Sequence, residues 1–275
     1  MAEVGRDPVV FLHDGSFEGF LTTVFEATRL KLPVAWVQAA AGYRPGLFEQ
    51  CWEVETSNES ASRVWKAIEA RGGDKIAGMV HGAFLSELPG IETDLWHYLR
   101  KFFAARNGLQ GRNLLDENVH AVFAAAEKTA HEAHRFQGFV RFQKVPDGSL
   151  FSVIAPDHNI LQILSSHFRV RYPGAKWMIA DSKRGLCLMG EHGKAEIVRV
   201  DPAKLPRSSG ESESFADASD RKFQDLWLSY YDAINIQERR NIRQMARLMP
   251  RKYWQYLPER QARRAGFAGA ALVGS

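Results

Sequence analysis

Histidine, carboxylate and guanidinium side chains that could transfer protons occur in four short segments between residues 134 and 184. They are His134 in HRF, His158 in PDHN, His167 in SSHF, and Asp181 and Arg184 in DSKRG. If the fold brought them into one cleft, the histidines and the carboxylate would suit proton transfer near neutral pH. We therefore take these five as candidate catalytic residues. The alternative is that the histidines pack or cap helices.

Two smaller groupings have spacings that suit chemistry. Glu127, His131 and His134 stand four and three residues apart on a predicted helix, a spacing that can ligate a metal but also occurs on solvated helix faces. We expect no bound metal and no cofactor. Asp14 and Glu18 stand one turn apart and could form an acid/base pair. A structural role is favoured, in which Asp14 is the N-cap of a helix.

Positive charge is concentrated near the C-terminus. Residues 221–264 contain 11 Lys or Arg and four Asp or Glu, a net +7, whereas the whole chain carries +4. On a helix, Arg239, Arg243 and Arg247 form one stripe, and RKYWQYL follows it. Such cations contact phosphates, and aromatic rings stack on exposed bases. The predicted nucleic-acid-binding residues are Arg239, Arg240, Arg243, Arg247, Arg251, Lys252, Tyr253 and Trp254. The alternative is a solvated helix whose rings, Tyr253, Trp254 and Tyr256, pack onto the core.

Several enzyme classes lose their sequence support. The motifs GxxxxGK[ST], GxGxxG after a strand, HExxH and GxSxG are all missing. Two cysteines, Cys51 and Cys187, cannot form a zinc site or a disulfide framework and are expected to be reduced thiols. The N-terminus lacks a signal-peptide core, and no run of about 18 apolar residues occurs. We expect a cytoplasmic protein with no membrane partner.

The first half of the chain is expected to be mainly helical. A strand at Val9–Leu12 and a turn precede an amphipathic helix over FEGFLTTVFEATRL. Residues 32–60 look irregular, with a possible strand at Cys51–Glu55. The helices expected after that are Ser60–Ala70, Lys75–Leu88, Glu92–Arg106 and Asp116–Phe136.

The pattern then changes from helical to strand periodicity. Gly138–Lys144 and Leu150–Ile154 predict a β-hairpin, and Asp157 is expected to cap a helix over His158–Arg169 with Ile160, Leu161, Leu164 and Phe168 on its core face. The further strands expected are Trp177–Ala180, Leu186–Met189 and Ala195–Val200. The predicted class is α+β: an antiparallel sheet (hairpin–helix–meander) packed with helices, plus a basic C-terminal helical segment.

The expected domain organisation has four parts. Residues 1–200 form the α+β core and 201–220 a flexible linker, because DPAKLPRSSGESESFADASD is poor in large apolar side chains. Residues 221–260 form the basic aromatic segment, packed on or beside the core. Residues 261–275 are a frayed tail.

The chain resembles a bacterial family of DNA metabolism proteins that contain domain of unknown function 4130. The residues that carry the resemblance are HDGSFEGFLTTVFEA, HRFQGFVRF, PDHNILQILSSHFRVRYPGAKWMIADSKRGL and NIQERRNIRQMARLMPRKYWQYLPE, and the likeness covers roughly residues 9 to 259. Members are encoded beside a radical-SAM protein, and some are fused to a uracil-DNA-glycosylase-like domain. The resemblance therefore implies DNA repair or modification alongside the radical-SAM enzyme, and supplies no catalytic residues.

Three functions follow as expectations. The first is a DNA-binding accessory protein that works with the radical-SAM partner on single- or double-stranded DNA. The second is an enzyme that acts on a damaged or modified nucleobase through the His/Asp/Arg residues. The third is a protein-binding adaptor. With only two cysteines, the chain lacks the three-cysteine cluster of a radical-SAM enzyme, so we expect it not to perform that chemistry itself.

Overall fold

The structure is a computed structural model that describes residues 7–105, 115–144, 148–200, 253 and 256. Its contacts divide the chain into two compact units. We call Met1–Ala130 the N-terminal unit and His131–Ser275 the C-terminal unit. Each is described by itself below.

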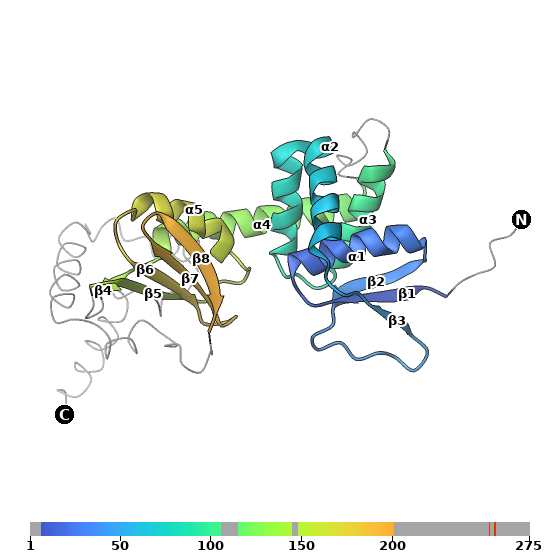
Figure 1. Cartoon of the computed structure of the whole chain (residues 1–275), viewed down its shortest axis with the longest axis horizontal. Helices are drawn as coiled ribbons and strands as arrows, with labels where there is room; N and C mark the ends of the chain where they lie inside the picture. The colour runs from blue at the N-terminus through green and yellow to red at the C-terminus, as the bar shows by residue number, and fades with distance from the viewer. Residues whose placement is uncertain (1–6, 106–114, 145–147, 201–252, 254–255, 257–275) are drawn as a thin grey trace, which may run out of the picture. The chain divides into compact units, whose positions relative to one another are not determined.

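The N-terminal unit is built on a three-stranded parallel sheet with the order β2-β1-β3 (Figure 1). All five residues of β1 (Val9–His13) are buried, as is typical of a central parallel strand. The edge strands are β2 (Val34–Ala39) and β3 (Gln50–Glu53), and every residue of β3 is exposed. The possible strand at Cys51–Glu55 is present as β3, one residue earlier, whereas β2 lies in a stretch that was predicted to be irregular.

Helices pack on this sheet and bury one large hydrophobic cluster, which includes Phe11, Phe20, Ile68 and Leu95. α1 (Phe17–Leu30) contacts α2 (Asn58–Phe84), and α2 is broken at Gly73, whose φ of 67° favours glycine. The helices that follow are α3 (Ile91–Ala104) and α4 (Glu117–Phe139); α4 contains the boundary between the two units.

The C-terminal unit contains a five-stranded mixed sheet with the order β4-β5-β6-β7-β8 (Figure 1). The predicted hairpin, helix and meander are present, but β5 and β6 pair in parallel, because α5 carries the chain back across the sheet. The prediction of a purely antiparallel sheet was therefore wrong. The elements are β4 (Gln143–Lys144), β5 (Leu150–Ile154), α5 (Leu161–Arg171), β6 (Trp177–Asp181), β7 (Leu186–Glu191) and β8 (Lys194–Arg199).

The core of the C-terminal unit forms where α5 packs on the sheet. The four predicted core residues of α5, Ile160, Leu161, Leu164 and Phe168, are all buried. On the sheet, the ring of Trp177 fills the place of a side chain at Gly190, since a Cβ there would lie 2.0 Å from it. Glycine at position 190 is therefore required by packing.

Two predicted helix caps were wrong. The N-cap of α1 is Ser16, whose hydroxyl accepts from the Gly19 amide at 2.9 Å, and not Asp14. α5 begins at Leu161, later than expected, and Asp157 does not cap it. At α1 the Asp14 carboxylate accepts from the Ser16 amide, while the Ser16 hydroxyl caps the helix. The N-cap of α5 is Ile160, which makes no side-chain capping bond.

Three predictions on organisation remain open. The linker at 201–220, the tail at 261–275 and the boundary at residue 200 lie outside the described residues or at their edge. Within the part of the chain that the structure describes, no helix combines the length and the apolar character needed to cross a bilayer.

Candidate functional site

The carboxyl ends of β5 and β6 lie side by side because the two strands are parallel, and three of the candidate catalytic residues meet there. Asp181, the last residue of β6, is completely buried and accepts a hydrogen bond from the Arg184 guanidinium at 2.9 Å. Asp181 also accepts from the backbone amides of Lys183 and Arg184. Burial raises the pKa of Asp181, while Arg184 opposes that shift.

Arg184 ties this turn to the loop that follows β5. Its guanidinium donates to the carbonyl oxygens of Pro156 at 3.1 Å and Asp157 at 2.6 Å. Lys183 donates to the same Asp157 carbonyl at 3.1 Å. The Asp181–Arg184 pair therefore holds the PDHN loop in place, which is a positioning role.

The other side of the PDHN loop is held by Glu132 of α4, a residue that the sequence analysis did not select. Its buried carboxylate accepts from the amides of Asp157 at 2.9 Å and His158 at 2.8 Å. The hydroxyl of Tyr253 donates to the same carboxylate. Burial, and then this bond to Glu132, raises the pKa of Tyr253.

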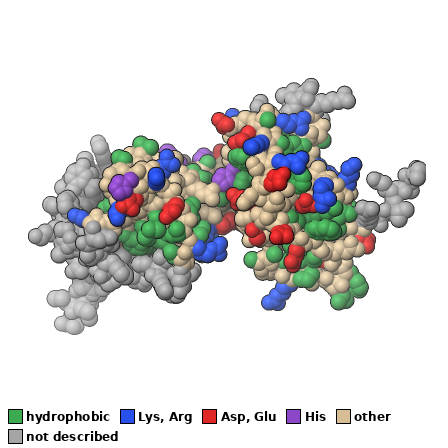
Figure 2. All heavy atoms as spheres, viewed as in Figure 1, with side chains coloured by type: hydrophobic (Ala, Val, Ile, Leu, Met, Phe, Trp, Pro, Cys, Tyr) green, Lys and Arg blue, Asp and Glu red, His purple; other side chains and the backbone are tan. Residues whose placement is uncertain are grey.

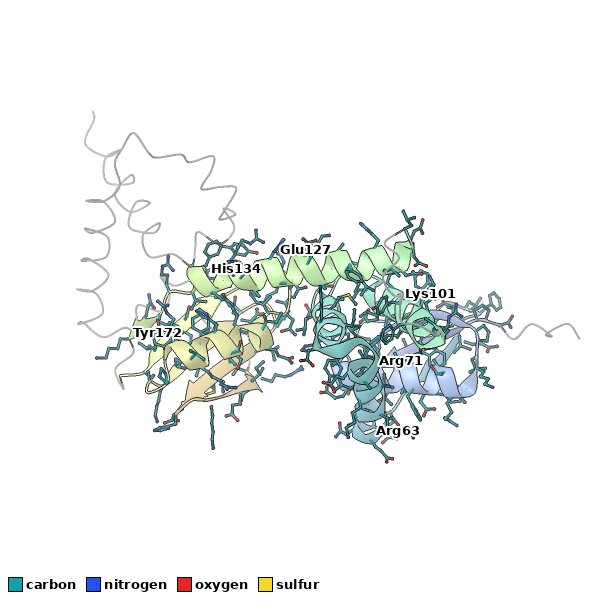
Figure 3. All side chains as sticks on the ribbon, turned by 90° about the horizontal axis from the view of Figure 1, so that it is seen from above. Arg63, Arg71, Lys101, Glu127, His134 and Tyr172 are labelled. Atoms are coloured by element: carbon teal, nitrogen blue, oxygen red, sulfur yellow. The ribbon has the colours of Figure 1, made fainter. Side chains whose placement is uncertain are left out.

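The histidines do not converge on the Asp181–Arg184 pair. His158 is held by its backbone amide, and His134 is exposed on α4 (Figure 3). His167 lies on α5, and its ring packs edge-on against Phe168. Within the described residues, His134 and His167 make no hydrogen bond to the other three candidates. The structure therefore brings together His158, Asp181 and Arg184, and the hydrogen bonds described for them hold the PDHN loop in place.

The predicted metal-spaced trio stays on the surface. Glu127, His131 and His134 are exposed residues of α4. Among residues that the structure describes, no group of three His, Cys, Asp or Glu side chains could hold a metal ion.

The basic C-terminal segment is described only at two tyrosines. Arg239, Arg240, Arg243, Arg247, Arg251, Lys252 and Trp254 lie outside the described residues. Tyr253 is 3% exposed and packs against Phe136 at 4.9 Å between ring centroids, so the expectation that its ring faces a nucleic acid is corrected. Tyr256 is also buried, against Val153 and Cys187. Both rings follow the alternative in which they pack on the core.

A second polar cluster lies in the N-terminal unit, at the carboxyl end of β1. His13 is 1% exposed, and its Nδ1 accepts from the Gly15 amide at 3.1 Å, which leaves the proton on Nε2. Nε2 is buried without a hydrogen-bond partner, and Oε1 of Glu92 in the first turn of α3 lies 3.8 Å away. Burial lowers the pKa of His13 to about 4 and raises the pKa of Glu92.

Asp14 stands beside His13 in a fixed position. Its carboxylate accepts from the Ser16 amide at 2.9 Å, the Ser16 hydroxyl at 2.6 Å and the Thr56 hydroxyl at 2.9 Å. Partial burial opposes ionisation, but these bonds together lower the pKa of Asp14. Gly19 makes room for it, because a Cβ there would lie 2.2 Å from Oδ1. Sequence analysis selected Asp14 but missed His13; the signal was a histidine at the end of a wholly apolar strand, directly before a turn and a helix.

The two units carry opposite net charge. The N-terminal unit has 13 Lys or Arg against 17 Asp or Glu, a net −4, and the C-terminal unit has 23 against 15, a net +8. Figure 2 shows Lys, Arg, Asp and Glu side chains on both units, so the division lies in the totals and not in a patch of one sign. The basicity of the chain therefore belongs to one unit.

These features define a two-unit α+β protein in which one unit holds a parallel sheet and the other a mixed sheet. A family profile described as a domain of unknown function, DUF4130, matches residues 89–259, which is more than half of the chain. The chain belongs to this family. The match begins just before α3, so it includes Glu92 but not His13. No curated protein and no solved structure matches the chain.

Proposed function

We propose that the protein is a DNA-binding accessory protein in DNA repair or modification, which works with a radical-SAM enzyme, and that its C-terminal unit contacts the phosphate backbone. The observation that carries the proposal is the charge division, +8 against −4. A polyanion is attracted to the basic unit and repelled by the acidic one.

Described residues provide part of the contact surface. Arg169 and Arg171 occupy the last turn of α5 and are both exposed, and Arg199 is exposed at the end of β8. Arg171 lies 5.9 Å from the Tyr172 ring, which supports its side chain without neutralising its charge. None of the three pairs with an acid among the residues described. These cations would act together with the basic residues of the 239–252 segment.

Salt dependence of DNA binding tests the proposal. Fluorescence anisotropy with single- and double-stranded oligonucleotides, starting at about 50 mM salt, should show affinity that falls steeply as salt rises. Replacing Arg239, Arg243 and Arg247 together by Gln should flatten the log–log slope for duplex DNA by roughly 2 to 3, since each phosphate contact contributes about 0.9. The Arg169→Gln/Arg171→Gln double variant should flatten it by about 1 to 2.

A matched control removes three positive charges from the acidic unit instead. The Arg44→Gln/Arg63→Gln/Arg100→Gln variant takes exposed cations from the N-terminal unit and should leave the slope almost unchanged. If the two triple variants flattened the salt slope equally, net charge alone would explain the effect, and the assigned contact surface would be refuted. Negligible affinity of the unaltered chain at low salt would refute DNA binding itself.

A second observation favours a protein contact in the N-terminal unit. Leu47 and Phe48, which are neighbours in the loop between β2 and β3, are 90% and 92% exposed. Exposed apolar side chains in a group mark interaction sites. We propose this patch as the contact for the radical-SAM partner. The Leu47→Ser/Phe48→Ser variant should lose co-purification with that enzyme in high salt and nuclease, yet keep its affinity for DNA.

A further inference from the structure

The buried imidazole of His13 is a donor without an acceptor. Its ring is enclosed by Phe20 and Phe84, at 6.1 and 6.3 Å between centroids, and its Nε2–H points toward a Glu92 oxygen that is too far away for a hydrogen bond. An unsatisfied buried donor costs about 1–3 kcal/mol. Five other buried side-chain atoms among the described residues also lack a hydrogen-bond partner, so it is the position of His13 that carries the inference. Its position, at the carboxyl end of a central parallel strand and before the N-terminus of a helix, is where ligands bind in α/β sheets.

The surrounding charges exclude an anion as the ligand. Asp14 is exposed and fixed by three hydrogen bonds, Glu18 is exposed in the first turn of α1, and Glu92 itself carries a carboxyl group. Glu87 adds further negative charge beside Glu92. Three or four acidic groups outweigh the partial positive charge of one helix end. The ligand is therefore neutral or cationic.

The separation of the two polar atoms defines the shape of the ligand's edge. Nε2 of His13 supplies a donor and Oε1 of Glu92 an acceptor, and at 3.8 Å the two can bind neighbouring atoms of one molecule rather than each other. The complementary edge has an acceptor next to a donor, as in a C(=O)–NH group within a ring. Side chains read nucleobases by this kind of paired contact.

Aromatic side chains near His13 favour a planar ligand. Phe84 lies 6.3 Å from the His13 ring, Phe17 packs against Phe84 at 5.2 Å, and both phenylalanines are partly exposed. Enzymes and binding proteins that take up a single base hold it against such rings while polar groups read its edge. The Glu92 side chain is 21% exposed, so it is the more accessible of the two polar groups.

We propose that His13 and Glu92 form a site for a single nucleobase with a lactam edge, such as thymine or guanine, read by the His13 Nε2–H and the Glu92 carboxylate. This inference rests on the proposed DNA-binding function, because it names what the acidic unit recognises when the basic unit holds the phosphates. Asp14 is a positioning residue that fixes the β1–α1 turn.

Titration of the full chain with thymidine tests the site, with the His13 imidazole signals in long-range ¹H–¹⁵N NMR as the readout. Thymidine should shift the Nε2 signal, and 3-methylthymidine, in which a methyl group replaces the N3 proton, should bind at least tenfold more weakly, equivalent to about 1.4 kcal/mol. His13→Phe should weaken thymidine binding, followed by calorimetry, by a similar factor. His120→Phe, an exposed histidine of α4, is the matched control and should bind as the unaltered chain does.

The outcomes separate this site from the proposed function. Equal affinity for thymidine and 3-methylthymidine, or thymidine binding that persists in His13→Phe, would overturn the site. The comparison of the two ligands uses only the unaltered chain, so it does not depend on whether a variant folds. The salt slope for duplex DNA should be the same in His13→Phe and the unaltered chain. If duplex binding were absent while thymidine still shifted His13, the DNA-binding function would fail and the base site would stand.

Discussion

Each unit buries a polar cluster beside the carboxyl ends of parallel strands, but the two clusters differ in how completely their groups are paired. In the C-terminal unit, Glu132 and Asp181 together accept from backbone amides, a guanidinium and a phenol. In the N-terminal unit, Nε2 of His13 has no partner. The C-terminal unit also has buried atoms without one, including Oδ1 of Asn159 and Nε2 of His167, but neither bonds to Glu132 or Asp181. The paired carboxylates stabilise a loop, whereas the unpaired His13 donor lies at the carboxyl end of a central strand, where ligands bind in α/β sheets. The comparison therefore assigns structure to the C-terminal cluster and binding to the N-terminal one.

The largest expected effect is on Glu132. Glu132→Ala leaves the amides of Asp157 and His158 and the hydroxyl of Tyr253 without their acceptor, so the free energy of unfolding should fall by about 4 kcal/mol. Urea denaturation measures the loss, and amide hydrogen exchange at Asp157 and His158 should become fast. Glu127→Ala, an exposed carboxylate on the same helix, should change stability by less than about 0.5 kcal/mol. A small effect at Glu132 would mean that the network is not structural.

The second prediction concerns pH and His13. The folded pKa of about 4 lies below the ordinary value of 6.5, so the unfolded chain binds the extra proton first. Stability from this residue is present above pH 6.5 and is lost as the pH falls toward 4, by up to about 3 kcal/mol. His13→Phe should remove that part of the pH dependence. At pH 7 it should cost only about 1 kcal/mol, because the Gly15 amide loses its bond to Nδ1 and Nε2 has no bond to lose.

Denaturation midpoints of the two proteins across pH 4 to 7 provide the measurement, with His120→Phe as the exposed-histidine control. Parallel curves for the unaltered chain and His13→Phe would show that the imidazole is not held neutral by burial. A loss of stability in His13→Phe at pH 7 well above that of the single Gly15 bond would show that Nε2 is already satisfied, and the contrast between the units would then disappear.

The smallest effect is expected at Tyr253. Tyr253→Phe removes one bond to the Glu132 carboxylate and keeps the ring contact with Phe136, so the free energy of unfolding should fall by about 2 kcal/mol. The Glu132→Ala/Tyr253→Phe double variant should be little worse than Glu132→Ala alone, since both changes remove the same bond. Additive losses would show that the two residues act independently.

The sequence predicted the local elements of this fold well. The apolar run Val9–Leu12 became a buried strand, and the periodic core face of α5 became a buried helix face. The break near Gly73 was visible as a Gly-Gly pair. These features depend on residues close together in the chain, which is the range that a periodic pattern reports.

What the sequence could not reveal depended on distant partners. The edge strand β2 exposes Trp36 and lacks the alternation of a half-buried strand, so it was not predicted. Parallel pairing of β5 with β6 follows from the path of α5 and not from either strand. Glu132 reaches the PDHN loop across 25 residues. His134 and His167 were grouped with Asp181 by residue type alone, and the fold separates them.

One consequence concerns the place where the family match begins. A fragment that starts at residue 89 would keep α3 but lose β1, β2, α1 and α2, which cover it. Leu95, Tyr98, Leu99 and Phe102 would then face water, and Thr93 would lose both of its bonds to the Val37 backbone. Any relative that retains only the matched region must cover this apolar face of α3 with a different domain or with a second protein.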